Sequence, residues 1–190
     1  MNNTRVWIYR GLVLLAVGAM VASFCLPWWA LSDIRTPEGV RLDGFNIYGY
    51  GFPQGQASLQ WESYWKEDIT PTYQIILAWA YVFISAGLLL YSTRLKGIKS
   101  NLLAGGIGLI YTAYAWVAVF FVIANRLATR GHSPIPLQGE GVAPGEWADV
   151  TFVTSIQPGF YFAFATGGFI VLLAILRRFI IGKPNALQKK

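Results

Sequence analysis

The residue types that most often carry out chemistry in proteins are scarce in this sequence, and most of them lie in two polar stretches. These candidates are carboxylates and the one histidine, namely Glu62, Glu67, Asp68, His132, Glu140, Glu146 and Asp149. No pair of them has the spacing that is typical of a metal site. Two carboxylates act as general acid and base only where the fold brings them together. The sequence therefore predicts no metal site and no catalytic residue.

Four long uncharged runs separate and position these polar stretches. The chain of 190 residues is 55% hydrophobic and 13% charged, which is about half the usual charged share. An uncharged run of about 20 residues can cross a bilayer as a helix, and the four runs are 22 to 27 residues long. We predict an all-α membrane protein, one domain over residues 1–190, in which a four-transmembrane-helix bundle carries a small extracytoplasmic β-hairpin or loop cap. The predicted spans are residues 11–31, 71–93, 101–125 and 155–180, and the predicted extracytoplasmic loops are residues 32–70 and 126–150.

The apolar runs lack the side chains that hold cofactors or conduct ions. They contain no lysine for retinal and no histidine for haem or a chlorin. Their strongest polar groups are Gln74, Asn101 and Asn125, all near the ends, and Cys25 is interpreted as a small buried residue. Ionisable groups within lipid mark ion paths and proton relays. The sequence therefore disfavours pumping, ion-coupled transport and redox catalysis, and it predicts no cofactor.

The charged residues indicate which side of the membrane each connection faces. The termini and residues 94–99 hold ten basic and no acidic residues, whereas the two longer loops hold five basic and all nine acidic residues. Connections rich in lysine and arginine face the cytoplasm, so both termini are predicted to be cytoplasmic. The net charge of +6 is then explained by contact with anionic lipid. We predict no nucleic-acid partner.

The connections also carry signals of local structure. A turn signal at residues 36–39, flanked by alternating residues, predicts a β-hairpin over residues 30–48. A helical period predicts a short interfacial helix over residues 58–69. The second loop is rich in glycine and proline and is expected to be irregular, while residues 150–153 either add a strand to the hairpin or begin the fourth span. Because residues 94–99 form a short turn, the second and third helices are predicted to be antiparallel neighbours.

Two sets of residues are predicted to pack the helices and to place them in the bilayer. Small residues spaced four apart let helix backbones approach closely in lipid. These helix-packing candidates are Gly18, Ala22, Ala104, Gly108, Thr112, Ala163 and Gly167. Tryptophan favours the headgroup zone. The predicted interface anchors are Trp28, Trp29, Trp61, Trp65 and Trp147.

The layout resembles that of claudin-like tetraspan membrane proteins. Trp28 or Trp29 stands where that family has the first tryptophan of its first outer loop, and residues 49–52 are a loose counterpart of its Gly-Leu-Trp motif. The two cysteines that pair in that family's loop are absent. The resemblance implies a self-assembling channel or a cell-contact protein. The segment at residues 26–29 is also similar to many small prokaryotic membrane proteins, which favours a prokaryotic plasma membrane.

The predicted spans lack ionisable and cofactor-binding side chains, and the two outer loops are sizeable. Together these features favour a non-catalytic integral membrane subunit of a larger membrane protein complex. Such a subunit braces partner helices and caps an extracytoplasmic region, and its partners are other integral membrane subunits and lipids. The alternative is the self-assembling claudin-like channel or cell-contact protein, for which a homo-oligomer is possible. A small membrane enzyme that uses Glu62, Asp68 and His132 is a third hypothesis.

Overall fold

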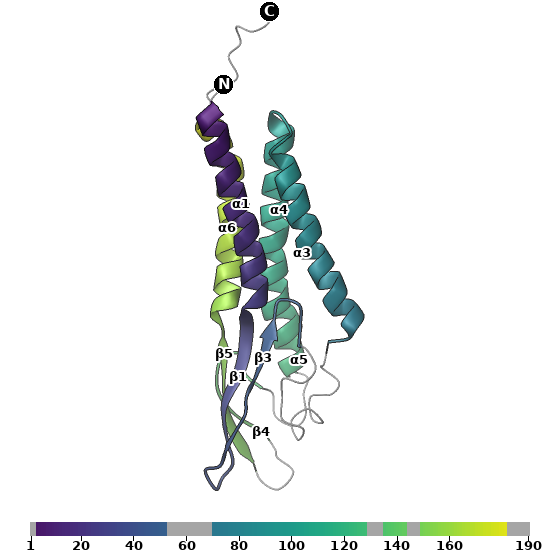
Figure 1. Ribbon diagram of the computed structural model, residues 1–190. Coiled ribbons are helices and arrows are strands. Elements are labelled where there is room, and N and C mark those ends of the chain that lie inside the picture. The colour runs from purple at the N-terminus through teal and green to yellow at the C-terminus, as the bar shows by residue number, and fades with distance from the viewer. Residues whose placement is uncertain (1–2, 53–69, 129–134, 144–148, 182–190) are drawn as a thin grey trace, which may run out of the picture.

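The protein consists of four long helices that continue at one end into a small antiparallel β-sheet (Figure 1). The computed structural model describes residues 3–52, 70–128, 135–143 and 149–181. Its helices are α1 (Asn3–Cys25), α3 (Thr72–Ser92), α4 (Ile98–Val117) and α6 (Pro158–Ile181), and α4 continues through the π-helix η2 (Ala118–Ile123) into α5 (Ala124–Ala128). All four long helices have the length and composition needed to cross a membrane. The start of α1 and the end of α6 lie at one end, here called the terminal end, and the sheet lies at the other, the sheet end (Figure 1).

The helices match the second and third predicted spans closely. The helix α1 begins at Asn3, before the predicted residue 11, and both α1 and α6 differ from their predicted spans at the sheet end. The helix α1 stops at Cys25 instead of reaching residue 31, and α6 begins at Pro158. Pro27 cannot continue the ladder of helical hydrogen bonds, so the backbone leaves α1 as an extended strand. The residues before Pro158 are likewise extended because they pair with that strand.

Within the described residues the sheet has five antiparallel strands, more than the hairpin that the sequence predicts. They are β1 (Pro27–Arg35), β2 (Arg41–Leu42), β3 (Phe45–Tyr48), β4 (Gly139–Ala143) and β5 (Val150–Ile156). The long strand β1 is central, with β2 and β3 on one side and β5 then β4 on the other. The protein is therefore mostly helical but not all-α.

The strand pairing tests several predictions about the segments that connect the helices. The hairpin over residues 30–48 is confirmed, because β1 pairs with both β2 and β3. Residues 150–153 belong to a strand and do not begin the fourth helix. The expectation that the second loop is irregular is wrong at residues 139–143, which form β4 because their backbone groups pair with β5. The predicted helix at residues 58–69 lies outside the described residues.

Two helices run directly into two paired strands, and this joins the sheet firmly to the helical part. Only Leu26 separates α1 from β1, and only Gln157 separates β5 from α6. The helices α1 and α6 pack together, and the strands that continue them are hydrogen-bonded neighbours (Figure 1). The Gln157 backbone N–H also donates to the Trp28 carbonyl oxygen at 2.9 Å. The sheet consequently has no flexible linker on this side.

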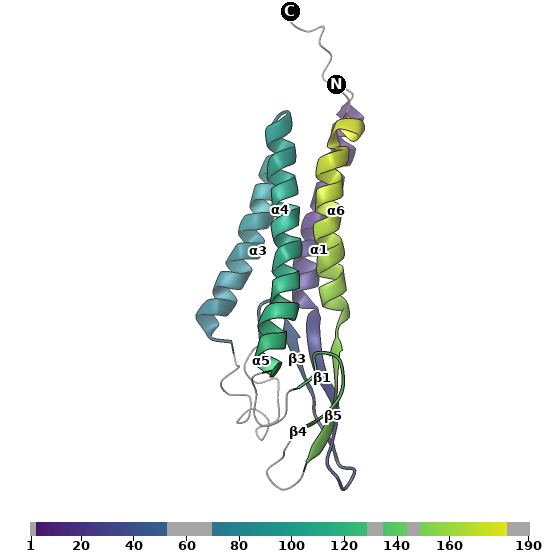
Figure 2. The same cartoon turned by 180° about the vertical axis from the view of Figure 1, so that it is seen from behind.

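Both α6 and α3 pack on α4 and α1, and the contacts of α6 are the more extensive. Towards the sheet end α3 diverges from α1, while α4 and α6 stay alongside each other (Figures 1 and 2). The antiparallel pairing of α3 with α4 follows from their short connection. Of the four apolar helices, α3 is the least buried: 28% of its most apolar stretch is buried inside the protein.

The small-residue candidates divide into two groups. Gly108, Thr112 and Gly167 lie at the α4–α6 contact, where a Cβ atom on Gly108 would come within 2.8 Å of the Gly167 carbonyl oxygen. Ala104 and Ala163 are also buried. Gly18 and Ala22 are exposed, and a Cβ atom on Gly18 would meet no atom within 4 Å. They do not pack helices within this chain, because they face away from its interior.

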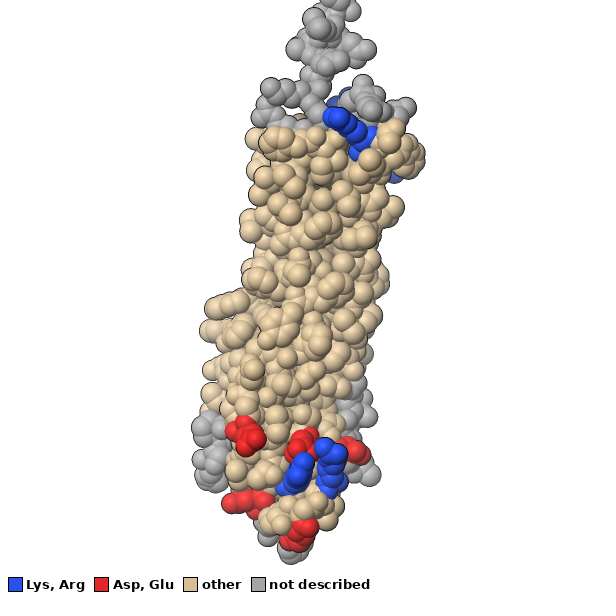
Figure 3. All heavy atoms as spheres, turned by 90° about the vertical axis from the view of Figure 1, so that its left-hand side faces the viewer, with Lys and Arg blue, Asp and Glu red and all other residues tan. Residues whose placement is uncertain are grey.

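The surface separates charge from apolar area along the length of the molecule. On the face drawn in Figure 3, the charged side chains lie at the two ends and a broad uncharged band lies between them. Many large apolar side chains on the helices are exposed, including Leu15 at 63%, Leu77 at 63% and Phe121 at 68%. Exposed apolar side chains over this length fit a lipid environment.

Candidate functional site: a cavity at the sheet end of the helices

The described residues contain no group of three or more His, Cys, Asp or Glu side chains that could hold a metal ion. Glu140 lies on β4 and Asp149 lies just before β5, and both are exposed. The other carboxylates considered from the sequence, and His132, lie outside the described residues. Cys25 is exposed and not buried as expected, because it sits on the outward side of the last turn of α1.

The titratable cluster that the structure does show is an ion-pair network on β1 and β2. The Asp33 carboxylate accepts hydrogen bonds from Arg35 at 2.9 Å and from Arg41 at 2.8 Å. These hydrogen bonds lower the pKa of the Asp33 carboxyl below its ordinary value, chiefly through Arg35 and then through Arg41. Asp33 has a positive φ of 49°, at the position where the pairing of β1 with β5 shifts register. The Asp33–Arg41 ion pair joins β1 to β2 at this irregular part of the sheet.

Trp28 fastens the first helix to the sheet. Its side chain is fully buried, and its Nε1–H donates to the Ser23 carbonyl oxygen at 2.8 Å. That carbonyl belongs to the last turn of α1, where the helix itself leaves carbonyl groups without partners. The ring packs edge-on against Phe24 and Tyr114, and Gly49 leaves room for it, since a Cβ atom there would lie 2.6 Å from the Trp28 ring.

Trp29 points to a different part of the sheet and is also fully buried. Its Nε1–H donates to the Leu137 carbonyl oxygen at 2.8 Å, which ties β1 to the segment before β4. Trp28 and Trp29 are therefore not headgroup anchors, because neither ring reaches the surface. A buried indole N–H needs a hydrogen-bond acceptor, and carbonyl oxygens within the protein accept from both Trp28 and Trp29. The other three predicted anchors, Trp61, Trp65 and Trp147, lie outside the described residues.

A cavity of about 250 Å³ lies where α3 diverges, between α3 and the continuous helix α4–η2–α5. The segment from Ile47 to Phe52, which leaves β3, forms its side towards the sheet. Thr70, Gln74 and Ala78 line it from the start of α3. Most lining side chains are apolar or aromatic, which is typical of sites for small or chain-like ligands.

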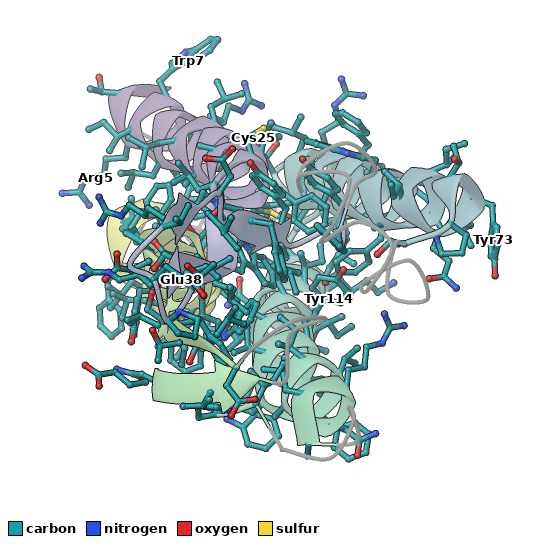
Figure 4. The ribbon with its side chains drawn as sticks, turned by 90° about the horizontal axis from the view of Figure 1, so that it is seen from below. Arg5, Trp7, Cys25, Glu38, Tyr73 and Tyr114 are labelled. Carbon is teal, nitrogen blue, oxygen red and sulfur yellow. The ribbon has the colours of Figure 1, made fainter. Side chains whose placement is uncertain are left out.

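Hydrogen bonds fix the walls of this cavity. The Tyr114 hydroxyl donates to the Gly49 carbonyl oxygen at 2.6 Å, which joins α4 to the β3 side. The Thr70 hydroxyl accepts from the Phe52 backbone N–H at 2.9 Å, which joins the start of α3 to the same segment. Figure 4 places Tyr114 in the interior between the helices and Tyr73 pointing away from the protein. The cavity is therefore a preformed feature of the fold.

Tyr50 stacks between Tyr48 and Trp79 on one side of the cavity, with ring centroids 5.1 Å and 5.6 Å away. Burial raises the pKa of the Tyr50 phenol, and Tyr48 and Cys25 raise it further. The phenol is consequently neutral at physiological pH and keeps its proton.

The π-helix η2 shapes the long wall of the cavity. Val117 and Ala118 line the cavity, and so do Val122 and Ile123, which lie five residues further along the chain. In a regular α-helix a step of five residues turns the side chain by about 140° around the axis. The π-helical turn has more residues, so both pairs face the same side. π-helical turns of this kind are frequent at functional sites.

The arginine Arg177 holds the opposite, terminal end together. Its guanidinium donates to the carbonyl oxygens of Leu95 at 2.8 Å and Gly97 at 3.2 Å, in the turn between α3 and α4. It also lies over the Tyr9 ring, 5.5 Å from the centroid. All three of these contacts are within the chain, so the Arg177 side chain serves to hold α6 against the α3–α4 turn and α1.

The sequence does not reveal the cavity, although it contains two hints of it. Gly49 and Gly51 interrupt the aromatic segment after β3, and Gly51 has a φ of 112°, which favours glycine. The divergence of α3 and the π-helical turn leave no sequence pattern, because both depend on how distant segments pack. No family model matches the chain, and no curated protein matches it. The geometry described above therefore carries the functional argument.

Proposed function

We propose that this chain is a non-catalytic integral membrane subunit of a larger membrane protein complex. In this proposal the four helices cross a prokaryotic plasma membrane, both termini are cytoplasmic, and the sheet projects on the outer side. The chain braces partner helices and caps an extracytoplasmic region of the complex. Its partners are other integral membrane subunits and lipids.

The observation that carries the proposal is the direct continuation of α1 and α6 into the paired strands β1 and β5. A sheet without a linker on this side moves with the helices, so a contact made outside the membrane is passed to the helical part. This is what a bracing subunit needs. The buried Trp28 indole and the partly buried Tyr114 hydroxyl join elements in this way.

The exposed face of α3 is the surface that best fits a partner helix. This helix has the smallest buried share of the four, and Ile76, Leu77 and Ile84 on it are 62%, 63% and 62% exposed. Shape-matched apolar side chains drive helix association in lipid through van der Waals contact.

The test is purification in a mild detergent followed by mass spectrometry. We expect at least one other membrane protein to co-purify in a fixed ratio, and alanine at Ile76, Leu77 and Ile84 to reduce its amount. The matched control is alanine at Leu14 and Leu15, which are 59% and 63% exposed on α1 and are expected to leave the ratio unchanged. A chain that purifies alone contradicts the proposal.

The second candidate is a self-assembling channel or cell-contact protein of the claudin-like kind, favoured by the edge of the sheet. Within the described residues β4 pairs with β5 on one side only, and an open strand edge can pair with another copy. In that case the purified material would consist of identical copies. Proline at Val142, in the middle of β4, would then reduce the assembly.

A further inference from the structure

We propose that the cavity between α3 and α4–η2–α5 binds one hydrocarbon chain of an anionic membrane lipid, with the lipid headgroup at Arg126. The lipid comes from the leaflet at the sheet end. The inference rests on the membrane placement in the proposed function but not on the existence of a protein partner.

Exposed apolar residues lie at the cavity on the continuous helix α4–η2–α5. Val117 and Val122 line the cavity, and each residue is 43% exposed. Nearby Phe121, on the same helix, is 68% exposed. A hydrocarbon chain can therefore enter between apolar side chains without passing through water, which costs it little free energy.

The position of Arg126 along the helix matches the depth of a headgroup. Lys99 and Arg126 are 27 residues apart on the continuous helix from Ile98 to Ala128. At 1.5 Å per residue this separation is roughly 40 Å, which equals the thickness of a bilayer with both headgroup regions. Val122 and Ala118 lie one and two turns from Arg126 towards the membrane centre. A headgroup at Arg126 thus places its chain along the cavity.

The charge and size of the cavity select the class of lipid. Arg126 is the one charged side chain among the described residues that line it, and Gln74 is a polar neighbour on α3. A guanidinium binds phosphate oxygens with strong, charge-assisted hydrogen bonds. A volume of about 250 Å³ is slightly below the roughly 300–1,000 Å³ of ordinary ligand pockets. It suits a segment of one chain, and the rest of the lipid stays in the leaflet.

The experiment measures lipid retained by the isolated chain. The protein is reconstituted into nanodiscs of phosphatidylcholine containing about a third phosphatidylglycerol, extracted into detergent and examined by native mass spectrometry. We expect one retained phosphatidylglycerol per chain. Ala118→Phe fills the cavity and should lower this occupancy roughly tenfold. Ala113→Phe, at an exposed position on the same helix, should leave it unchanged. Val122→Trp narrows the same cavity from its open side and provides a second variant if Ala118→Phe does not fold.

A charge variant tests the headgroup part of the inference. Arg126→Gln should lower phosphatidylglycerol retention roughly tenfold and remove the preference over phosphatidylcholine. Lys99→Gln, an exposed position at the terminal end, should change neither. Equal retention in wild type and Ala118→Phe overturns the proposal, as does equal retention of the two lipids by the wild type. Displacement by inorganic phosphate alone also overturns it, because the site would then recognise a soluble anion. A chain that lacks a protein partner would still give these lipid results, so the two proposals fail separately.

Discussion

Buried polar side chains in this protein act mainly as ties between elements. The Trp28 indole closes the end of α1, the Trp29 indole holds the segment before β4, and the Tyr114 hydroxyl joins α4 to the segment after β3. Each donates to a backbone carbonyl oxygen of another part of the chain or of a helix end. An unpaired buried polar group costs about 1–3 kcal/mol, so these few bonds help determine how the sheet sits on the helices.

Trp28→Phe is expected to destabilise the folded protein by about 1–3 kcal/mol, because the Ser23 carbonyl loses its donor while a ring remains. Thermal unfolding in detergent measures this loss, at roughly 2–4 °C per kcal/mol for a chain of this size. The control is Trp116→Phe, since Trp116 is 53% exposed on α4. Equal losses in the two variants would contradict the role given to the Trp28 indole.

Asp33→Asn is expected to weaken the pH dependence of stability in acid. The hydrogen bonds from Arg35 and Arg41 lower the folded-state pKa of Asp33 from its ordinary 3.8. A lowered carboxyl pKa stabilises the folded protein above the ordinary value, and this stabilisation is lost as the pH falls towards the folded-state pKa. Asparagine also tolerates the positive φ at this position.

The measurement for this prediction is the unfolding temperature between about pH 6 and about pH 3. Asp43→Asn removes an exposed carboxylate outside the cluster and is the control. The pKa of Glu38 is also lowered, by its own backbone and by the Thr36 hydroxyl, and this contribution persists in both variants. A wild type and an Asp33→Asn variant with parallel pH profiles would refute the role of the ion pairs.

Helix contacts in this protein depend on small residues at one interface and on an irregular turn at another. At the α4–α6 interface, Gly108 and Gly167 let the two backbones approach, and the Thr112 hydroxyl donates to the Gly108 carbonyl oxygen at 2.9 Å. On the other side of α4, the π-helix η2 holds two pairs of side chains against the cavity. One helix thereby packs tightly on α6 and leaves room next to α3.

Gly167→Ala is expected to destabilise the protein by about 1–3 kcal/mol through overpacking. Its Cβ atom would lie 3.0 Å from the Gly108 carbonyl oxygen and closer still to the Thr112 hydroxyl. Gly168→Ala, one residue further on, would meet no atom within 4 Å. That control should be neutral or stabilising by up to about 1 kcal/mol. Unfolding by titration with a denaturing detergent compares the two, and equal effects would contradict the close α4–α6 contact.

At the scale of the entire protein, the face drawn in Figure 3 is long and largely uncharged, with the charged side chains at its two ends. The start of α1, the end of α6 and the α3–α4 turn share one end, and the sheet occupies the other (Figure 1). This arrangement fits four crossings of a membrane with the basic end in the cytoplasm. The orientation is a proposal that labelling can test directly.

In a Cys25→Ser background, Val142→Cys on β4 is expected to react with a membrane-impermeant maleimide in intact cells. Thr4→Cys, near the start of α1, should react only after the membrane is opened. Val142 is 52% exposed, and Thr4 is exposed as well, so access depends on sidedness alone. The reverse pattern would show that the termini lie outside the cell. Labelling of both cysteines in intact cells would contradict the proposal that a membrane separates the two ends of the protein.

Local patterns in the sequence predict the helices and the hairpin, because hydrophobic run length and turn residues act over short distances. The uncharged runs mark the four helices, and the turn at residues 36–39 marks the hairpin. The first helix was expected to extend to residue 31 because the run stays uncharged through Ser32, but α1 ends at Cys25. Trp28 to Leu31 are apolar for a different reason, since they lie in a buried strand.

Contacts between distant segments determine the remaining features. The strand β4 forms only because β5 offers a pairing edge, and β5 is extended because β1 pairs with it. The cavity likewise requires α3 to diverge from α1 and η2 to turn its side chains towards the gap. The sequence alone determines that the helices are apolar and long enough for a bilayer, because the hydropathy of a run is the sum of contributions from its own residues. The cavity and the sheet exist only after packing, since each is bounded by segments that are far apart in the chain.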